Sequence, residues 1–478
     1  MSGSIIDLSA AAPSRRQIIT RLGGGFGAVA LAALLGKTAV ASTADAGYSV
    51  SPRPPHHSPR AKAVIQLFMH GGPSHIDLLD PKPVLAQHDG QPPPSHITDK
   101  SGITKTLLQS PFVFARHGQS GVEFSELLPH TSRHADSISV IRSMVTEHRN
   151  HEQALWMMHT GLTVPGRPTI GAWAIYGLGS ENENLPAYVV LPAPAPPVDG
   201  IRNWSSGWLP PVFQGTPFRA EGMPIQNLRP RTATPPAIER GRQRMLAELN
   251  ASHRARHPQE RQIEARIASF ELAARMQISA TQALDIASEP PHVRELYGLD
   301  NPVTASYGSR CLLARRLVER GVRFVQIFMA GQPWDTHTNN AEGTRRCCQE
   351  TDLPVAGLLT DLRDRGLLDS TLVFWGGEFG RTPAVQEIGG MVQGGRDHHP
   401  YGFSIWLAGG GIKGGQVYGA TDDFGYHAVQ DRCTVADLHA TMLYLLGLDH
   451  KKLTFFREGR DDRLTDIREA SILRRLFM

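Results

Sequence analysis

The sequence predicts an α/β fold of three layers, in which a mostly parallel central sheet is covered by helices on both faces. Short apolar runs rich in β-branched and aromatic residues alternate with amphipathic segments along most of the 478 residues, which is the pattern of repeated strand–helix units. The runs are apolar throughout, as in strands buried on both faces of a parallel sheet. Clusters of polar residues follow several of them directly, where the loops of such a sheet carry functional groups.

The N-terminal segment has the layout of an export signal. Arg15 and Arg16 precede an apolar, glycine-rich run at 22–35, and small residues occupy 39–41. This layout resembles a twin-arginine signal peptide, residues 1–41, that leaves Ser42 first after cleavage. The apolar run is shorter than the ~20 residues that a stable membrane span needs. We therefore expect export to the periplasm or the cell exterior, with no stable span after cleavage; an uncleaved tether is the alternative.

The rest of the chain divides into a linker and one large domain. Residues 42–60 are rich in proline, serine and histidine, which is typical of a linker, and the domain extends over 61–478. The net charge is only +4, without a basic block interleaved with aromatic residues, so no nucleic-acid partner is expected. The four cysteines are too few and too irregularly spaced for a disulfide framework or a zinc knuckle. Nothing in the sequence indicates an oligomeric state.

The predicted elements of the domain follow one another in strand–helix order. Strands are expected at 63–69, 138–141, 187–191, 322–328, 372–375 and 402–407. Helices are expected at 124–134, 311–319, 353–365 and 435–446. Residues 236–290 repeat apolar positions at helical spacing among charges, which predicts a helical insertion. The glycine-rich stretch between Glu378 and Phe403 is expected to be a loop.

Four of the predicted strands are followed by loops that carry carboxylate, imidazole or guanidinium groups. Because the C-terminal ends of parallel strands face one edge of the sheet, these loops are expected to converge. In chain order they hold Ser74, His75 and Asp77; Asn150 and His151; Asp335 and His337; and Glu378, Arg381, Asp397, His398 and His399.

The donor atoms of these loops are oxygen and imidazole nitrogen, without a thiolate. Such donors suit one or two divalent metal ions, with Zn²⁺, Mn²⁺, iron, Mg²⁺ and Ca²⁺ not distinguished. Ions of this kind activate water or polarise a phosphoryl or sulfuryl oxygen, and Arg381 is suited to hold an anionic group. The sequence therefore predicts a metal-dependent site for a small anionic, phosphorylated or sulfated substrate, with a glycan among the candidates.

Most of the domain, residues 61–449, resembles a known family. The stretches that carry the resemblance are FMHGGPSHIDLLDPKP, NHEQALWMMHTG, CLLARRLVERGVRFVQIF, WDTHTNN, GGEFGRTP, GRDHHPYGFSIWLAGGGIKGG and VADLHATMLYLLG. They are similar to an exported family of domains of unknown function, DUF1501, within the alkaline phosphatase and sulfatase superfamily. The resemblance implies the alkaline-phosphatase-like three-layer sandwich.

The resemblance also implies roles for individual residues. It implies a metal-binding aspartate in the first loop, which offers His70, His75 and Asp77, and Asp77 is our choice. It makes Asp335 and His337 ligands of one metal, and Glu378 a ligand of the other. A late histidine ligand falls on His398 or His399. His151, preceded by Asn150, falls where the superfamily has a serine, threonine or formylglycine nucleophile.

Position 151 therefore departs from the pattern of the superfamily, since it offers neither a hydroxyl nor a thiol. Its histidine is either a nucleophile or a metal ligand. Two functions follow for the chain. The first is an exported metal-dependent hydrolase of phosphate or sulfate esters. The alternative is a non-catalytic metal- or glycan-binding envelope protein that retains the hydrolase fold.

Overall fold

The computed structural model describes residues 49–97, 104–219, 235–256, 283–388 and 391–477, together with 267, 271, 272 and 276. Nearly all of them belong to the second of two compact units, Val50–Met478. The predicted signal peptide, 1–41, and residues 42–48 of the predicted linker lie outside the described residues. Within the described part of the chain, no helix has both the length and the apolar character that a membrane span requires.

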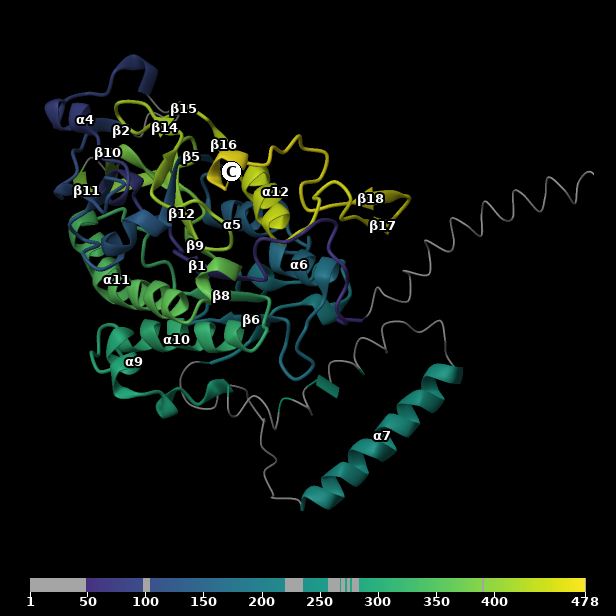
Figure 1. The fold of residues 1–478 in the computed structure, drawn as a ribbon. Coiled ribbons are helices and arrows are strands. Elements are labelled where there is room, and N and C mark those ends of the chain that lie inside the picture. The colour runs from purple at the N-terminus through teal and green to yellow at the C-terminus, as the bar shows by residue number, and fades with distance from the viewer. Residues whose placement is uncertain are drawn as a thin grey trace, which may run out of the picture. The chain divides into compact units, whose positions relative to one another are not determined.

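A mixed, mostly parallel sheet forms the centre of this unit (Figure 1). In the described residues it has nine strands in the order β13–β5–β12–β9–β1–β8–β6–β7, with β16 paired to β5. The strands are β1 Ala63–Phe68, β5 Ile138–Val145, β6 Tyr188–Leu191, β7 Thr216–Pro217, β8 Phe324–Phe328, β9 Thr371–Gly376, β12 Phe403–Ala408, β13 Gln416–Tyr418 and β16 Cys433–Thr434. Only β12 pairs antiparallel to its neighbours, β5 and β9.

Nine α-helices are present in the described part of the chain. They are α3 His75–Leu78, α4 Pro83–Gln87, α5 His151–Thr160, α6 Ile170–Leu178, α7 Pro236–Arg256, α9 Pro291–Leu296, α10 Ala305–Glu319, α11 Asn340–Asp364 and α12 Val435–Leu445. Short 3₁₀ turns are η1 Ser95–Ile97, η2 Thr131–Ser137, η3 Gly200–Trp204, η4 Pro211–Phe213, η5 Ile286–Ser288, η6 Leu368–Ser370 and η7 Arg474–Leu476. A capping box between Thr434 and Asp437 fixes the start of α12.

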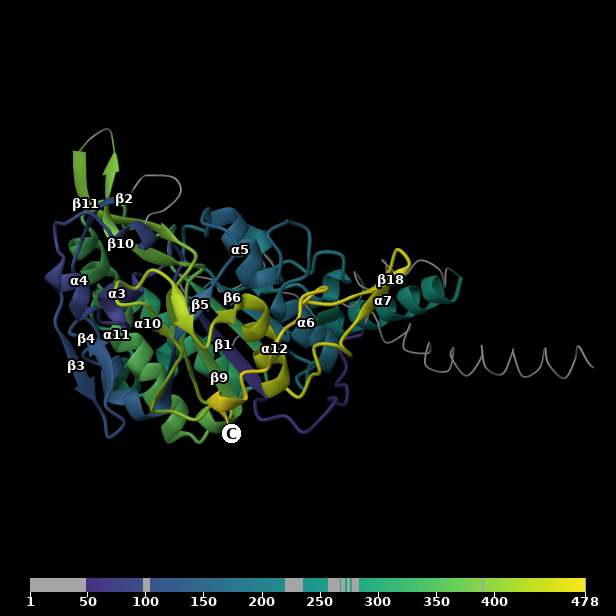
Figure 2. The same ribbon diagram turned by 90° about the horizontal axis from the view of Figure 1, so that it is seen from above.

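Alternate residues of the central strands face two separate cores, which makes the three layers. Ile65 and Leu67 of β1 pack in the core that contains α10 and α11. Val64 and Phe68 pack in the core that contains α5, α6 and α12. This division follows from the two-residue period of a strand, and it requires strands that are apolar on both faces. Figures 1 and 2 show the two helical layers on opposite sides of the sheet. The predicted fold class is confirmed.

Smaller sheets complete the unit. A three-stranded sheet joins β2 Thr104–Leu107, β10 Gly380–Ile388 and β11 Met391–His399. Two-stranded sheets pair β3 Phe114–His117 with β4 Val122–Ser125, β14 Ala420–Thr421 with β15 Ala428–Gln430, and β17 Phe455–Arg457 with β18 Arg460–Asp462. Figure 2 shows β10 and β11 projecting from the body of the unit.

Two predicted elements are wrong. The helix expected at 124–134 is instead the end of β4 followed by η2, because Pro129 disfavours a helical conformation at Leu128. The glycine-rich loop expected after Glu378 is the pair β10 and β11, in which Arg381 faces His398 across an antiparallel ladder. The predicted helical insertion contains α7, but too little of its remainder is described to compare.

The topology brings the polar loops to one edge of the sheet. The strands β1, β8 and β9 are mutually parallel, and β5 runs in the same direction because β12 is antiparallel to both β5 and β9. The loops that leave these four strands therefore lie at one edge. Since β12 runs the opposite way, it begins at that edge, and β11, which leads into it, ends there with His398 and His399.

Candidate metal centre

His151 stands at the centre of the polar cluster. It is the first residue of α5, directly after the N-cap Asn150. Nδ1 of its ring lies 2.6 Å from Oε1 of Glu378. Nε2 lies 3.3 Å from Oδ2 of Asp335, within range of charge attraction but without the alignment of a hydrogen bond. Burial by itself lowers the pKa of His151, but the carboxylates of Asp335 and Glu378 outweigh it and raise the pKa to about 9.

Glu378 supplies a fully buried carboxylate. It is separated from β9, which ends at Gly376, by Gly377 alone, and it is 0% exposed. The backbone amide of Gly71, in the loop after β1, donates to both of its oxygens at 3.0 and 3.2 Å. Burial opposes ionisation, but the hydrogen bond from His151 and the charge of His70 keep the pKa of Glu378 below its ordinary value. A buried anion of this kind is suited to hold a cation.

A second carboxylate, Asp335, gathers two histidines. Its Oδ1 lies 2.9 Å from Nε2 of His337 and 3.1 Å from Nε2 of His398. The two Nε2 atoms are 2.9 Å apart. Burial raises the pKa of Asp335, but its contacts with His151, His337 and His398 outweigh burial and hold the pKa well below its usual range. Two ring nitrogens and a carboxylate oxygen so close together are the donor set of a metal site.

The structure adds two residues that the predicted ligand set lacked. Three groups of side chains offer ligand atoms within 4.8 Å of one another: His70, His151 and Glu378; His151, Asp335 and His398; and His337, Asp397 and His398. Nδ1 of His70 is buried without a hydrogen-bond partner among the described residues. The signals for both additions are in the sequence, because His70 lies two residues after β1 and Asp397 directly precedes His398.

The groups differ in their access to solvent. The Glu378 side chain is 0% exposed and that of His151 is 10% exposed, whereas Asp335 is 22% and His337 27% exposed. At the exposed end Arg149, whose side chain is 34% exposed, places Nη2 3.8 Å from Oδ2 of Asp397. The centre thus has a buried end at Glu378 and an open end at His337.

The structure does not bring Asp77 or His399 into these groups. The carboxylate of Asp77 is fully buried and accepts from Arg396, Ser74 and Asn340 at 2.6–3.1 Å. Burial opposes the charge of Asp77, but Arg396 outweighs it and lowers its pKa. The ring of His399 is bonded through Nε2 to the carbonyl of Tyr426 and stacks on His75. These side chains support β11 and its neighbours from outside the cluster.

Asn150 is the N-cap directly before His151, and Arg381 lies at the cluster but faces protein groups where an anionic substrate group was expected. The guanidinium of Arg381 is 0% exposed and donates to the carbonyls of Gly71, Gly72 and Arg396 and to Asp335. It therefore orients Asp335 instead of reaching a substrate anion. Asn150 is exposed, and its backbone amide donates to Nδ1 of His148.

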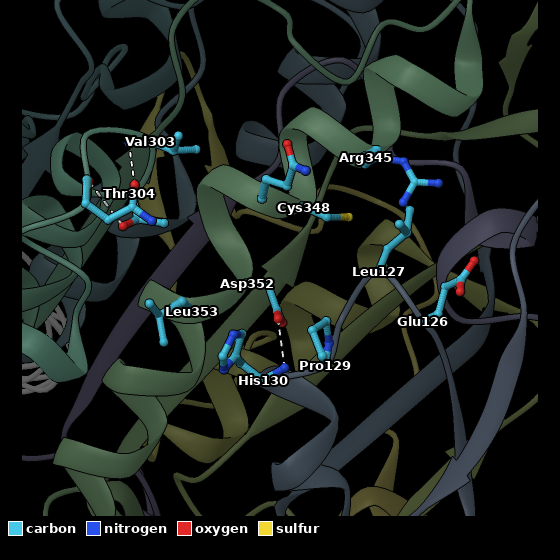
Figure 3. Close-up of a pocket in the computed structure, with 12 residues that line it drawn as sticks. Glu126, Leu127, Pro129, His130, Val303, Thr304, Arg345, Cys348, Asp352 and Leu353 are labelled. Atoms are coloured by element: carbon cyan, nitrogen blue, oxygen red, sulfur yellow. Dashed lines mark hydrogen bonds between the residues drawn. The ribbon is translucent and has the colours of Figure 1, made fainter.

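A separate cavity lies away from the ligand groups. It has a volume of about 490 Å³ and is bounded by the segment 126–130 between β4 and η2, by α11 and by the residues before α10 (Figure 3). Its carboxylate Asp352 accepts from the amides of His130 and Thr131, both at 2.8 Å. None of the ligand groups lines this cavity, so it is not part of the candidate metal centre.

Comparison with family models assigns the chain. The model described as "Protein of unknown function (DUF1501)" matches residues 61–477, which is most of the sequence. The chain belongs to this family. The resemblance inferred from the sequence motifs is thereby confirmed at the level of the family, whose description names no activity. A search of curated proteins finds no match.

Solved structures with a detectable likeness include a sulfatase, a lipoteichoic acid synthase and an alkaline phosphatase. The PsFucS1 sulfatase from Pseudoalteromonas sp. is 12% identical, with 86% of this chain and 72% of that chain covered and a TM-score of 0.36. The lipoteichoic acid synthase LtaP from Listeria monocytogenes is 9% identical, with 88% and 80% covered and a TM-score of 0.36. An alkaline phosphatase from the Antarctic bacterium TAB5 is 13% identical, with 82% and 99% covered and a TM-score of 0.35. Their activities are not transferred to this chain.

The close approach of the β1 and β8 loops predicts a strict requirement for glycine at position 71. Gly71 has φ +116°, and a Cβ there would lie 2.5 Å from the backbone nitrogen of Asp335. We expect Gly71→Ala to lower the free energy of unfolding by about 1–3 kcal/mol from strain alone, measured by urea denaturation. The matched control is Gly331→Ala, with φ +61° and no atom within 4 Å, for which we expect a loss of about 1 kcal/mol. Equal losses would contradict the steric argument.

The ion pair between Asp77 and Arg396 predicts a structural role for Asp77. Both side chains are 0% exposed, so Asp77→Ala leaves a buried guanidinium unpaired and is expected to lower the free energy of unfolding by about 3–5 kcal/mol. The control is Asp364→Ala, which breaks the exposed pair with Arg363 and is expected to lose less than about 1 kcal/mol. The metal content of folded Asp77→Ala protein is expected to equal that of wild type. If Asp77→Ala lost a metal ion while its free energy of unfolding stayed at the wild-type value, Asp77 would be a metal ligand after all.

Proposed function

We propose that this chain is a metal-dependent hydrolase of phosphate or sulfate esters that acts after export. The observation that carries the proposal is the meeting of three overlapping ligand groups at one edge of the sheet. They come from loops after four strands that run in the same direction and from the end of β11. The members of these groups are far apart in the sequence, and each is polar and ionisable. The burial of apolar side chains therefore does not explain why they lie together.

The donor chemistry fits divalent transition metals. Imidazole nitrogen and carboxylate oxygen suit Zn²⁺, Mn²⁺ or iron, whereas Mg²⁺ and Ca²⁺ prefer sites made of oxygen alone. The buried position would be held by His70, His151 and Glu378, and the exposed position by Asp335, His337, His398 and Asp397. A cation at these positions polarises a phosphoryl or sulfuryl oxygen and lowers the pKa of water. The orphaned Nδ1 of His70 is consistent with this fit.

The residues around the ligands have separate tasks in this proposal. The guanidinium of Arg381 donates to Asp335 and orients its carboxylate, and the backbone amide of Gly71 does the same for Glu378. Arg149, at the open end, is suited to hold the anionic group of the substrate, since its side chain is partly exposed beside Asp397. The N-terminus of α5 also favours a negative charge there. A small phosphorylated or sulfated molecule, with a glycan among the candidates, matches these groups.

The second candidate is a non-catalytic protein that binds metal or glycan in the cell envelope. It is favoured by one observation, namely that the position of the superfamily's hydroxyl nucleophile is taken by His151. Turnover separates the two functions, because both require the same ligands and only the hydrolase releases phosphate or sulfate.

The adjacent histidines at the end of β11 provide a matched test of the metal centre. His398→Ala is expected to lower the affinity for metal by more than about 10- to 100-fold, the loss typical of outer partners of a ligand. His399→Gln keeps a donor for the carbonyl of Tyr426 and is expected to retain the wild-type metal content. Elemental analysis of protein purified without chelator measures both. Wild-type protein without a stoichiometric transition metal would contradict the proposal that the chain is a metal-dependent hydrolase.

Turnover is measured on a panel of aryl phosphates and aryl sulfates. We expect hydrolysis by wild type and its loss in His398→Ala. Arg149→Ala is expected to lower kcat/KM by about tenfold or more, because a hydrogen bond to a charged group is worth ~1.5–3 kcal/mol. The control is Arg133→Ala, a change at an exposed arginine of η2, which should leave kcat/KM unaltered. Metal-loaded wild type without turnover on the whole panel favours the binding protein.

Export is proposed from the residues of the N-terminal segment. Arg15→Lys with Arg16→Lys keeps the charge but removes the arginine pair, and is expected to hold the protein inside the cell. The charge-conserving control Arg21→Lys lies outside the pair and should be exported. N-terminal sequencing of exported protein is expected to begin at Ser42. Normal export of the double variant would refute the twin-arginine route, and an intact N-terminus would indicate a tether.

A further inference from the structure

One ring joins the two ends of the candidate metal centre. Nδ1 of His151 faces Oε1 of Glu378 at 2.6 Å, in the ligand group with His70. Nε2 lies 3.3 Å from Oδ2 of Asp335, in the ligand group with His398. The two nitrogens occupy different sides of the imidazole ring. His151 is thus a member of both groups, and each of its two ring nitrogens faces the carboxylate of one group.

We propose that the imidazole of His151 bridges two divalent cations, one held with His70 and Glu378 and the other with Asp335 and His398. The inference rests on the proposed metal-dependent function and specifies how its two metal positions are connected. It assigns His151 as a ligand of both positions and not as the nucleophile.

The packing of His151 suits a bridging ligand, which must keep one orientation. The residue is 9% exposed and opens α5, so its backbone is fixed by the first turn of the helix. Its ring centroid is 4.9 Å from that of Phe379 and 4.3 Å from that of His398, the latter in an edge contact. The ring of His70 stands perpendicular to it at 6.2 Å. Neighbouring rings on several sides therefore restrict rotation of the imidazole.

Two imidazole nitrogens of the ligand groups, one in the His151 ring and one in the His70 ring, lack a hydrogen bond in the described part of the chain. Nε2 of His151 and Nδ1 of His70 are both buried without a hydrogen-bond partner among the described residues. Buried polar atoms in folded proteins are nearly always paired. These two imidazole nitrogens make no hydrogen bond to a described residue, and Nε2 of His151 has only its 3.3 Å charge contact with Asp335, so they indicate ligand positions on both sides of the ring.

The bridge has a definite proton balance and a chemical consequence. A neutral imidazole has one lone pair and one N–H group. The pKa of His151 is raised to about 9, so the ring of the metal-free protein carries a proton on each nitrogen, and each proton passes to solvent when its nitrogen binds a cation. Both nitrogen lone pairs are then used. The ring has no donor left with which to attack a phosphoryl or sulfuryl group, so the attacking group must come from elsewhere.

Copper provides the probe for the bridge, because two Cu²⁺ ions joined by an imidazolate couple magnetically. The folded full-length chain is stripped by chelator and titrated with Cu²⁺, with stoichiometry from elemental analysis and spin count from electron paramagnetic resonance. Wild type is expected to bind two ions per chain and to show far less signal than two isolated spins. His151→Gly is expected to recover uncoupled spins, and added imidazole is expected to restore the coupling.

Two further variants keep the result independent of the folding of His151→Gly. His70→Ala removes a ligand of the buried position and is expected to leave one ion with a full, uncoupled signal. His148→Ala, a partly exposed histidine outside the ligand groups, is the matched control and should keep both ions and their coupling. Circular dichroism and thermal unfolding verify that each variant is folded.

The outcomes separate the bridge from the proposed function. Two ions with the full signal of isolated spins, or only one ion in wild type, overturns the bridge while hydrolysis of the ester panel by the native enzyme still stands. Two coupled ions without hydrolysis of any ester supports the bridge and overturns the catalytic proposal. Loss of coupling in His148→Ala also overturns the bridge, since that ring touches neither position.

Discussion

The site is organised by the need to bury one carboxylate, Glu378. An unpaired carboxylate in its fully buried position would cost several kcal/mol. The amide of Gly71 and the ring of His151 satisfy its oxygens, and this requires the loop after β1 to press against the backbone of Asp335, where only glycine fits. One buried charge thereby fixes the relative positions of the loops that leave β1, β5, β8 and β9.

The parts of the fold that were predictable from sequence are those set by local pattern. The strands from Ala63 and Thr371 are apolar on both faces and could be placed within a few residues, and the convergence of the loops after them follows from a parallel sheet. The direction of β12 was not predictable, because a strand buried on both faces reads the same whether it runs parallel or antiparallel. The hairpin of β10 and β11 was also missed, since its glycines are typical of loops, and its pairing depends on partners elsewhere.

The site itself was predictable in its residue types but only partly in their roles. Asp77 and His70 both follow β1, and from the sequence alone the carboxylate and the imidazole are equally suitable as metal ligands. The deciding fact is the partner of each: Asp77 meets Arg396, whereas His70 meets His151 and Glu378. In the same way, Arg381 has the chemistry to bind an anion, but its donors are taken by backbone carbonyls and Asp335. Such pairings belong to the tertiary structure.

The graded exposure of the ligands has a consequence for the assembly of the centre. An ion that arrives from solvent meets the open end at His337 before the buried end at Glu378. If the centre binds two ions, as proposed, the inner position would be reached through the outer one, and the two would be filled in sequence and emptied in the reverse order. A chain that crosses a membrane already folded would carry its inner ion with it from the compartment of synthesis.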